Sequence, residues 1–242
     1  MRLAFFSDVH ANLAALNAVI LDFRAEKIDR IFFLGDAVGY GPNPNECVEL
    51  IDEIAEIKLM GNHDYAALGL MKTDYFNQYA AESMSWTKDS ISQKAIEILS
   101  DFEITSEVDN FMLVHASPKE PDQWHYILDM DDVVENFEYF KNQICLIGHT
   151  HRPYIVTRDE EGSCSISQKE QENICDNKRY LINIGSVGQP RDSDPRSCYL
   201  ICDTEKKIVR LKRIAYNLNE TQKQMSKAGL PEYLIERLAV GR

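Results

Sequence analysis

Residues 57–64 read IKLMGNHD, an apolar run of strand length followed by a glycine and three polar side chains. An ordinary turn explains this stretch, because Gly61 and Asn62 are common turn residues and Asp64 can cap a helix. A site that uses an amide, an imidazole and a carboxylate for chemistry explains it equally well. The pattern in the rest of the chain decides between the two interpretations.

Other apolar runs of strand length lie on both sides of this stretch, and helical periodicity fills several of the gaps. The runs are LAFF (3–6), IFFL (31–34), FMLVH (111–115) and ICLI (144–147). One intervening helix is marked by the apolar residues Leu13, Leu16, Ile20 and Phe23. Pro44 opens a second helix at a favoured first-turn position. The order β-α-β-α-β up to about residue 150 predicts parallel strands.

Beyond residue 153 the apolar runs are short and come without long helical stretches. They read YIVT, CSIS, YLINI, CYLIC and IVRLKRIAY. They predict antiparallel hairpins that form a second sheet, and the polar stretch 160–178 is expected to be a long hairpin connection. The predicted fold is therefore an α/β (α+β) four-layer αββα sandwich, with two mixed β-sheets flanked by helices.

The length of 242 residues suits one sizeable core, so we expect a single domain over residues 1–242. Residues 73–102 are expected to form a small helical insertion in this domain. The aromatic and apolar residues of the insertion include Tyr79, Met84, Trp86 and Ile98. Either the insertion caps the functional site, or it is an outer helix pair that packs on the core through those residues.

Composition limits the classes of function. No apolar run approaches the roughly 20 residues of a membrane-spanning helix, so we expect no membrane partner. Asp8 interrupts the N-terminal apolar run before a signal peptide can form, and six cysteines without a CxxC pair suit reduced thiols. Both features predict a cytoplasmic location. A formal net charge of −13 argues against polymeric nucleic acid as a substrate. An oligomer of this chain stays possible.

Chemistry-bearing side chains follow the predicted strands at the points where each strand ends. They are Asp8 and His10 in SDVH, Asp36 in LGD, Asn62 in GNHD, His115 in LVH, and His149 and His151 in GHTH. Open α/β sheets bind their ligands beyond the carboxyl ends of the strands, so these residues are expected to meet at one edge. Of the six histidines, His125 alone lies outside these blocks.

The donor types of this set indicate a metal site. Carboxylate oxygens, imidazole nitrogens and an amide oxygen suit borderline divalent ions such as Mn²⁺, Fe²⁺ or Zn²⁺, and the lack of thiolates argues against structural zinc. Seven ligands are too many for one ion. If Asp36 bridges two ions, each ion has four protein ligands and open positions for water and substrate. Two ions roughly 3.5–4 Å apart can stabilise both ends of an in-line phosphoryl displacement.

The ordered blocks SDVH, GD, GNHD, H and GHTH resemble the signature of the calcineurin-like metallophosphoesterases, over about residues 3–190. The resemblance implies a hydrolase with a binuclear metal centre, in which a metal-bound hydroxide attacks the substrate. The first ion would be bound by Asp8, His10, Asp36 and His151. The second ion would be bound by Asp36, Asn62, His115 and His149. Manganese is the expected metal, with Fe, Zn, Ni or Co as alternatives.

The resemblance also implies roles for the last two side chains of GNHD. His63 would be a general acid that protonates the leaving oxygen, and Asp64 would orient its imidazole. Elementary chemistry agrees, because a neighbouring carboxylate positions a histidine and keeps it protonated near neutral pH.

Wider segments resemble the bacterial phosphodiesterase branch of this superfamily, which includes dinucleoside tetraphosphate hydrolases. They are GDAVGYGPNPNEC (35–47), SPKEPDQWHYIL (117–128) and IGSVGQPRD (184–192). The resemblance implies a phosphodiester or phosphoanhydride bond in a small phosphorylated substrate, with a dinucleotide as one candidate. Arg191 can pair with a phosphate oxygen, as a catalytic-site residue, or form a surface salt bridge. Tyr40, Trp124 and Tyr126 can stack on a base or serve as packing residues. Asn12 can touch the substrate or cap the first helix.

Two alternatives stay open at this point. A phosphomonoesterase or protein phosphatase is one, because nothing in the sequence measures the room beyond the metals. A non-catalytic scaffold of the same fold is the other. The complete ligand set and the presence of His63 count against the scaffold.

Overall fold

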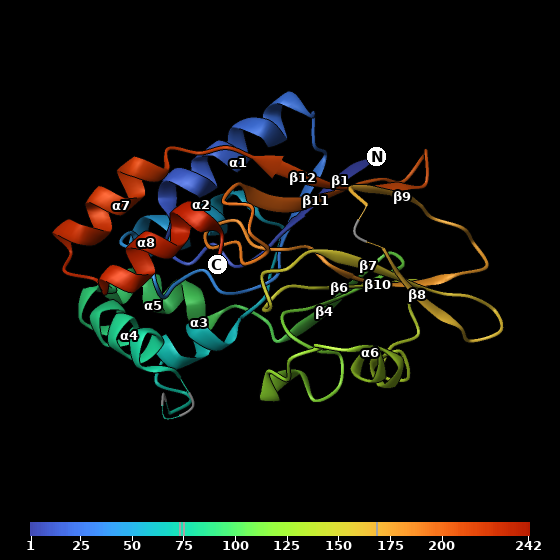
Figure 1. The fold of residues 1–242 in the computed structure, drawn as a ribbon, viewed down its shortest axis with the longest axis horizontal. Helices are drawn as coiled ribbons and strands as arrows, with labels where there is room; N and C mark the ends of the chain where they lie inside the picture. The colour runs from blue at the N-terminus through green and yellow to red at the C-terminus, as the bar shows by residue number, and fades with distance from the viewer. Residues whose placement is uncertain (73, 75, 168) are drawn as a thin grey trace.

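The computed structural model describes residues 1–72, 74, 76–167 and 169–242, and its strands form two mixed sheets (Figure 1). In spatial order, the first sheet contains β3 (Ile57–Lys58), β2 (Arg30–Phe33), β1 (Arg2–Phe6), β11 (Ser197–Asp203), β12 (Ile208–Ile214) and β9 (Gln171–Asn173). The second contains β4 (Thr105–Val108), β5 (Phe111–Val114), β6 (Ile144–Ile147), β10 (Arg179–Asn183), β7 (Tyr154–Arg158) and β8 (Cys164–Ser167). As predicted, β1, β2 and β3 run parallel, and so do β5 and β6.

Helices cover the outer faces of the two sheets, which confirms the predicted four-layer α/β architecture (Figure 1). They are α1 (Leu13–Ala25), α2 (Pro44–Ile54), α3 (Asn62–Ala67), α4 (Gln78–Ser90), α5 (Gln93–Ser100), α6 (Met130–Asn136), α7 (Leu218–Lys227) and α8 (Glu232–Val240), with a short 3-10 turn at Pro121–Gln123. None of the described helices is long and apolar enough to cross a membrane.

The strand β1 illustrates how the layers form. Successive side chains of a strand point to opposite faces. Leu3 and Phe5 therefore join the core between the two sheets, whereas Ala4 and Phe6 join the core beneath the helices of the first sheet. Both faces are apolar, so β1 reads as a continuous apolar run.

The strands beyond residue 153 do not form a second sheet by themselves, so this expectation is wrong. β11 pairs with β1 in antiparallel orientation, with Phe5 opposite Leu200, and β9 and β12 extend that first sheet. β7, β8 and β10 instead extend the sheet begun by β4, β5 and β6. An apolar run identifies a strand, but its partner across the sheet is a distant part of the chain.

The polar stretch 160–178 consequently passes from one sheet to the other. β8 belongs to the second sheet and β9 to the first, and residue 168 between them lies outside the described residues. The expected hairpin is present only as the pairing of β7 with β8.

Two helical segments flank the edge where the parallel strands end. Within the predicted insertion 73–102, residues 73 and 75 lie outside the described residues, and α4 and α5 pack through Met84 and Leu99 on the first sheet. The helices α7 and α8 follow β12 and were not predicted from the sequence. The ring of Tyr79 on α4 stacks on Tyr233 of α8 at 4.6 Å. That the insertion caps the site stays a prediction.

Candidate metal centre

The seven predicted ligands meet at the carboxyl-terminal edge of the strands, as the sequence predicts. Asp8 and His10 follow β1, Asp36 follows β2, Asn62 begins α3 after β3, His115 follows β5, and His149 and His151 follow β6. All seven side chains are buried. Residues from five separate parts of the chain thus converge on one small volume.

Five of these seven residues adopt a left-handed backbone conformation, which residues other than glycine rarely do. Their φ angles are 54° at Asp8, 47° at His10, 60° at Asp36, 63° at His149 and 59° at His151. Such a conformation costs of order 1–3 kcal/mol per residue and persists only where the surroundings enforce it. Such strain at several of the chemistry-bearing residues is typical of a functional site.

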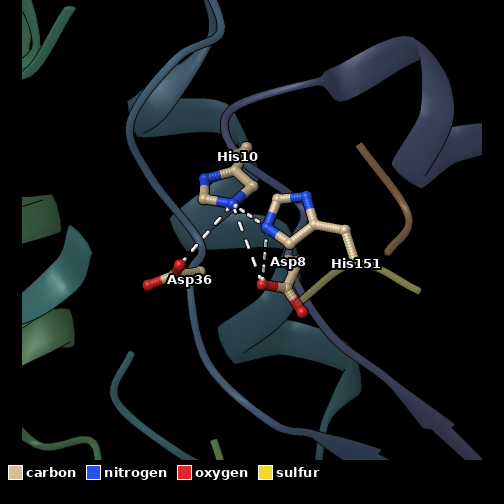
Figure 2. A group of neighbouring side chains, drawn as sticks. All are labelled: Asp8, His10, Asp36 and His151. Atoms are coloured by element: carbon tan, nitrogen blue, oxygen red, sulfur yellow. Dashed lines mark hydrogen bonds and ion pairs between the residues drawn. The ribbon is translucent and has the colours of Figure 1, made fainter. Parts of the chain in front are cut away.

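The first group of ligands contains Asp8, His10, Asp36 and His151, each of which offers an atom within 4.8 Å of the others (Figure 2). The Nε2 atom of His151 lies 3.1 Å from Asp8 Oδ1 and 3.1 Å from His10 Nε2. The Nε2 atom of His10 lies 3.5 Å from Asp36 Oδ2. Four donor atoms therefore face a common point, as they would around one ion.

The second group contains Asp36, His115 and His149 and shares its carboxylate with the first. The Oδ2 atom of Asp36 lies 3.4 Å from His115 Nε2, close to its distance from His10. One carboxylate oxygen therefore faces both groups, which is the geometry that a bridging ligand requires. Asn62 lies beside this group, because the backbone N–H of the next residue, His63, donates to Asp36 Oδ1 at 2.8 Å.

Backbone carbonyls orient three of the imidazoles. The Nδ1 atoms of His10, His115 and His151 lie 3.0, 2.7 and 2.6 Å from the carbonyl oxygens of Val38, Leu34 and Gln189. A carbonyl beside Nδ1 keeps the proton on that nitrogen and leaves Nε2 free to coordinate. In each ring the Nε2 atom is the one that faces the cluster.

Unsatisfied buried atoms test whether a metal fits this site. The Oδ1 atom of Asn62 and both ring nitrogens of His149 are buried without a hydrogen-bond partner among the described residues. Leaving such a polar atom unpaired costs about 1–3 kcal/mol. Oxygen and imidazole nitrogen are donors that Mn²⁺, Fe²⁺ and Zn²⁺ accept, so the residues present fit divalent ions.

The charge states of His149 and Asp36 agree with this fit. Burial and the nearby charge of His115 together lower the pKa of His149 to about 3, so the ring is neutral and able to coordinate. Burial opposes charge on Asp36, but His115 and the other imidazoles hold its pKa well below the ordinary value. The centre therefore keeps anionic carboxylates beside imidazoles at neutral pH.

Two glycines make room for the carboxylates. A Cβ atom on Gly61 would lie 2.1 Å from Asp36 Oδ1, and a Cβ atom on Gly148 would lie 2.4 Å from Asp8 Oδ2. Neither position tolerates a side chain without displacement of a predicted ligand. Sequence reasoning did not assign these glycines a role, although each directly precedes a ligand in GNHD and GHTH.

Asp64 does not orient the imidazole of His63, so this expectation is corrected. Its Oδ2 atom accepts the backbone N–H groups of Asp36 and Gly61 at 2.8 and 3.0 Å, and its Oδ1 atom accepts that of Val38 at 3.1 Å. The carboxylate thus ties the loop after β2 to the start of α3. It positions Asp36 through its own backbone and Asn62 through the backbone of the preceding Gly61.

His63 is held by aromatic rings. The rings of Tyr40 and Phe76 lie 4.5 and 4.8 Å from its imidazole, and that of His10 lies 4.8 Å away. Burial lowers the pKa of His63 to about 4, against the opposing effect of Asp36. The expectation of a protonated imidazole near neutral pH is therefore wrong for the free protein.

Arg191 lies at the rim of the cluster, and its backbone N–H donates to the carbonyl of His151 at 3.2 Å. Its guanidinium donates to Gln189 Oε1 at 2.8 Å and lies 5.5 Å from the centroid of the Tyr40 ring. Among the described residues it has no carboxylate partner within ion-pair distance. The surface salt bridge considered for Arg191 is thus not formed, and the guanidinium remains available to an anion.

The sequence also left open the roles of Asn12, Trp124 and Tyr126, and the structure shows what each side chain contacts. Asn12 caps α1 by accepting the N–H of Ala15 at 3.2 Å. Trp124 is buried, whereas Tyr126 is half exposed and stacks on His149 at 4.1 Å. Only Tyr126 of these residues presents a substantial surface beside the metal centre.

A cleft of about 510 Å³ adjoins Arg191. Arg152 and Arg213 line it together with apolar side chains that include Ile127, Leu128 and Leu211. Arg213 is paired with Asp192, so its charge is already compensated. The cleft combines an apolar wall with positive charge next to the metal centre.

The chain belongs to the calcineurin-like phosphoesterase superfamily, whose domain matches residues 1–207. It is 39% identical to the uncharacterized protein MJ0912 of Methanocaldococcus jannaschii, over 99% of this chain and 98% of that protein. A 100-residue stretch, 37% of this chain and 46% of the other, is 29% identical to serine/threonine-protein phosphatase 2 of Escherichia coli.

Solved structures agree with this assignment. A metallophosphoesterase from Sphaerobacter thermophilus is 40% identical, with a TM-score of 0.88 over 100% of this chain and 99% of that one. The hypothetical protein PH1004 from Pyrococcus horikoshii OT3 is 17% identical, with a TM-score of 0.80 over 100% of this chain and 98% of that one. At 17% identity, the likeness to the Pyrococcus horikoshii protein shows a shared fold alone.

Proposed function

We propose that the protein is a two-metal-dependent phosphoesterase that hydrolyses phosphodiester or phosphoanhydride bonds of small nucleotide-like substrates. The observation that carries this proposal is the shared carboxylate. Asp36 Oδ2 faces His10 Nε2 at 3.5 Å and His115 Nε2 at 3.4 Å, so one oxygen serves two ligand groups. Superfamily membership supports the phosphoesterase chemistry.

Asp8, His10, Asp36 and His151 would hold one ion, and Asp36, Asn62, His115 and His149 the other. When bound, two such ions activate a nucleophile at neutral pH and stabilise charge on the phosphate. The carbonyl contacts of the imidazoles hold these side chains in place before any ion or substrate arrives. Mn²⁺ is the proposed ion, because the donors are oxygen and imidazole nitrogen.

His63 acts as the general acid in this proposal. Its imidazole is neutral in the free protein, and the negative charge of an entering phosphate raises its pKa, so the proton is acquired as substrate binds. Arg191 binds a phosphate oxygen through its uncompensated guanidinium. Asp64 does not touch substrate in this proposal. Its hydrogen bonds hold the loop that carries Asp36 in place.

The cleft beside Arg191 supports a substrate larger than a phosphate ion. At about 510 Å³ it has room for an organic leaving group, and its apolar wall suits a base or nucleoside. Tyr126 offers an exposed ring at the same edge. A small phosphorylated molecule fits this geometry better than a nucleic-acid polymer, which the net charge of −13 would repel.

The alternative of a phosphomonoesterase or protein phosphatase has one specific support, the similarity to the serine/threonine-protein phosphatase of Escherichia coli over 100 residues.

We also propose a cytoplasmic location, because buried free thiols such as Cys47, Cys145 and Cys198 suit a reducing compartment.

The test compares four substrates with purified protein and added Mn²⁺. They are bis(4-nitrophenyl) phosphate, diadenosine tetraphosphate, 4-nitrophenyl phosphate and single-stranded DNA. We expect turnover of the first two, loss of activity on chelation, and about two Mn²⁺ ions per chain by elemental analysis. Preference for the monoester supports the phosphatase alternative, preference for DNA contradicts the proposed substrate class, and full activity without metal contradicts the mechanism.

A further inference from the structure

Gln189 is a buried polar residue of the loop between β10 and β11, in the segment GSVGQPR (185–191). Its side chain is only 2% exposed, and its amide nitrogen Nε2 is buried without a hydrogen-bond partner among the described residues. Such an unpaired donor costs about 1–3 kcal/mol, so an apolar side chain would suit this position better if it served packing alone. What distinguishes glutamine from an apolar residue here is its oxygen.

That oxygen holds the guanidinium of Arg191. Oε1 of Gln189 accepts one hydrogen bond from Nε at 3.3 Å and one from Nη2 at 2.8 Å. The orientation of the amide follows, because a guanidinium has only donors and must face the oxygen. The two bonds use two of its five N–H groups. Arg191 makes no other side-chain hydrogen bond with the described residues, so three N–H groups at the other end of the fork remain for an anion.

The backbone of Gln189 is fixed against the candidate metal centre. Its carbonyl oxygen lies 2.6 Å from Nδ1 of His151, and its N–H donates to Ser186 Oγ at 2.9 Å. The hydroxyl of Ser186 in turn donates to the carbonyl of Asp8 at 2.9 Å. Gln189 thus has a defined position relative to two proposed ligands, and its side chain transmits that position to Arg191.

The charge of Arg191 reaches the site and is not compensated. Its guanidinium lies 5.5 Å from the centroid of the Tyr40 ring, which lies 4.5 Å from the ring of His63. Burial lowers the pKa of His63, and the charge of Arg191 is the next largest influence that lowers it. The adjacent carboxylate of Asp192 pairs with Arg213 instead of Arg191.

We propose that Gln189 is a positioning residue that aims Arg191 at a phosphate oxygen of the substrate and leaves its positive charge uncompensated. A carboxylate at this position would accept the same hydrogen bonds but would neutralise the guanidinium. An apolar side chain would leave the charge but release the guanidinium. The neutral amide oxygen holds the arginine and keeps its charge for the substrate. This inference rests on the proposed function, in which Arg191 binds phosphate.

A double-variant cycle tests the positioning role. Inorganic phosphate is titrated calorimetrically into Mn²⁺-loaded protein freed of excess metal. Gln189→Met keeps the approximate length of the side chain and removes the oxygen, so phosphate affinity should fall about fivefold or more, and Arg191→Gln should lower it at least as much. In the Arg191→Gln background, adding Gln189→Met should change the affinity less than about twofold, because no guanidinium is left to position.

A merely structural role for Gln189 predicts the same loss of affinity in both backgrounds. That result would overturn the proposal, and so would a wild-type protein that does not bind inorganic phosphate.

Gln189→Glu tests why the acceptor is neutral. Glutamate has the same shape and keeps an oxygen beside Arg191, so a requirement for packing alone predicts no change in phosphate affinity. We expect a fall of about fivefold or more, because the carboxylate compensates the guanidinium. Gln93→Glu, at an exposed position of α5, adds the same charge without contact with Arg191 and should bind phosphate like the wild type. Wild-type affinity in Gln189→Glu, or an equal loss in Gln93→Glu, contradicts the proposal.

Metal analysis and kinetics separate the possible failures. Both Gln189 variants should keep the wild-type Mn²⁺ content, because His151 contacts the backbone carbonyl of residue 189 and not its side chain. A lower content would place the defect in the metal centre and reject the positioning role. If the wild-type protein hydrolyses no test substrate, the proposed function fails, while the phosphate titration still tests Gln189. If circular dichroism shows that Gln189→Met does not fold, the affinity of Gln189→Glu decides.

Discussion

The two ends of β1 carry clusters of charged side chains that differ in their physical properties. At its start, Arg2 pairs with Glu26, and Glu26 also accepts from Lys212 at 2.7 Å. Beyond its end, Asp8 lies in the candidate metal centre, fully buried and in a left-handed conformation. The first cluster consists of matched opposite charges that are partly exposed. The second consists of carboxylates and imidazoles with several unsatisfied atoms.

The pKa values express the same difference. Hydrogen bonds from Lys212 and Arg2 lower the pKa of Glu26 to about 2, although burial opposes them, so the fold stabilises its charge. In the metal centre, burial lowers the pKa of His149 to about 3, so the fold disfavours a charged ring. A cluster that stabilises the fold satisfies its own charges, whereas a binding site leaves them for a ligand. Variants in the metal centre should therefore lose activity, whereas variants in the first cluster should lose stability and keep their activity.

The largest effect is expected from Asp36→Asn, which removes the carboxylate shared by both ligand groups. Activity should fall on the order of 10³-fold or more, since losing one electrostatic contact in an active site typically costs about 10²–10³-fold. Bound metal should fall well below two ions per chain. Because the folded-state pKa of Asp36 lies well below its ordinary value, its charge stabilises the fold at neutral pH, so the unfolding temperature of the metal-free protein should also fall. Unchanged metal content would reject the bridging role.

His63→Ala tests the general acid. With a nucleoside leaving group the rate should fall about 10²–10⁴-fold, because no group then protonates the leaving oxygen. With a nitrophenyl leaving group the loss should be much smaller, since that group departs without protonation. Metal content should stay at the wild-type level. Equal losses on both substrates, or loss of metal, would remove His63 from this role.

Asp64→Ala tests the corrected role of that carboxylate. Three backbone N–H groups lose their acceptor, and each one left unsatisfied costs about 1–3 kcal/mol. The loop that carries Asp36 should loosen, so Mn²⁺ affinity is expected to fall about 10–100-fold, as for other groups that support metal ligands. Titration calorimetry and thermal unfolding measure the two effects. A rate loss with unchanged metal affinity and stability would instead favour an interaction with His63.

The smallest effect is expected at the other end of β1. Glu26→Gln should lower the free energy of unfolding by about 1–2 kcal/mol at pH 7 and leave kcat/KM unchanged. The folded-state pKa of Glu26 is about 2, below its ordinary value of 4.5, so its contribution is present above pH 4.5. It should disappear as the pH falls from 4.5 toward 2. Denaturant unfolding at several pH values checks this, and a pH-independent difference between wild type and variant would contradict it.

The sequence by itself was sufficient for much of the fold and for the residues that meet in the candidate site. Apolar runs of strand length located most of the strands, because burial between two layers requires apolar side chains on both faces. The seven proposed ligands could be found because each lies at or within a few residues of the end of such a run, and parallel strands bring their carboxyl ends to the same edge. Asp8, Asp36 and His149 are thus local features of the sequence.

Only the tertiary structure shows which segments of the chain pair or pack against each other. The strand beside β1 is β11, some 195 residues later in the chain, and no local pattern specifies that pairing. The acceptor role of Asp64 depends on backbone N–H groups that a loop from another strand presents to it. Periodicity in the sequence identifies the buried and the exposed face of a helix or strand. Which other segment packs on the buried face depends on contacts between distant parts of the chain, and these contacts are visible only in the tertiary structure.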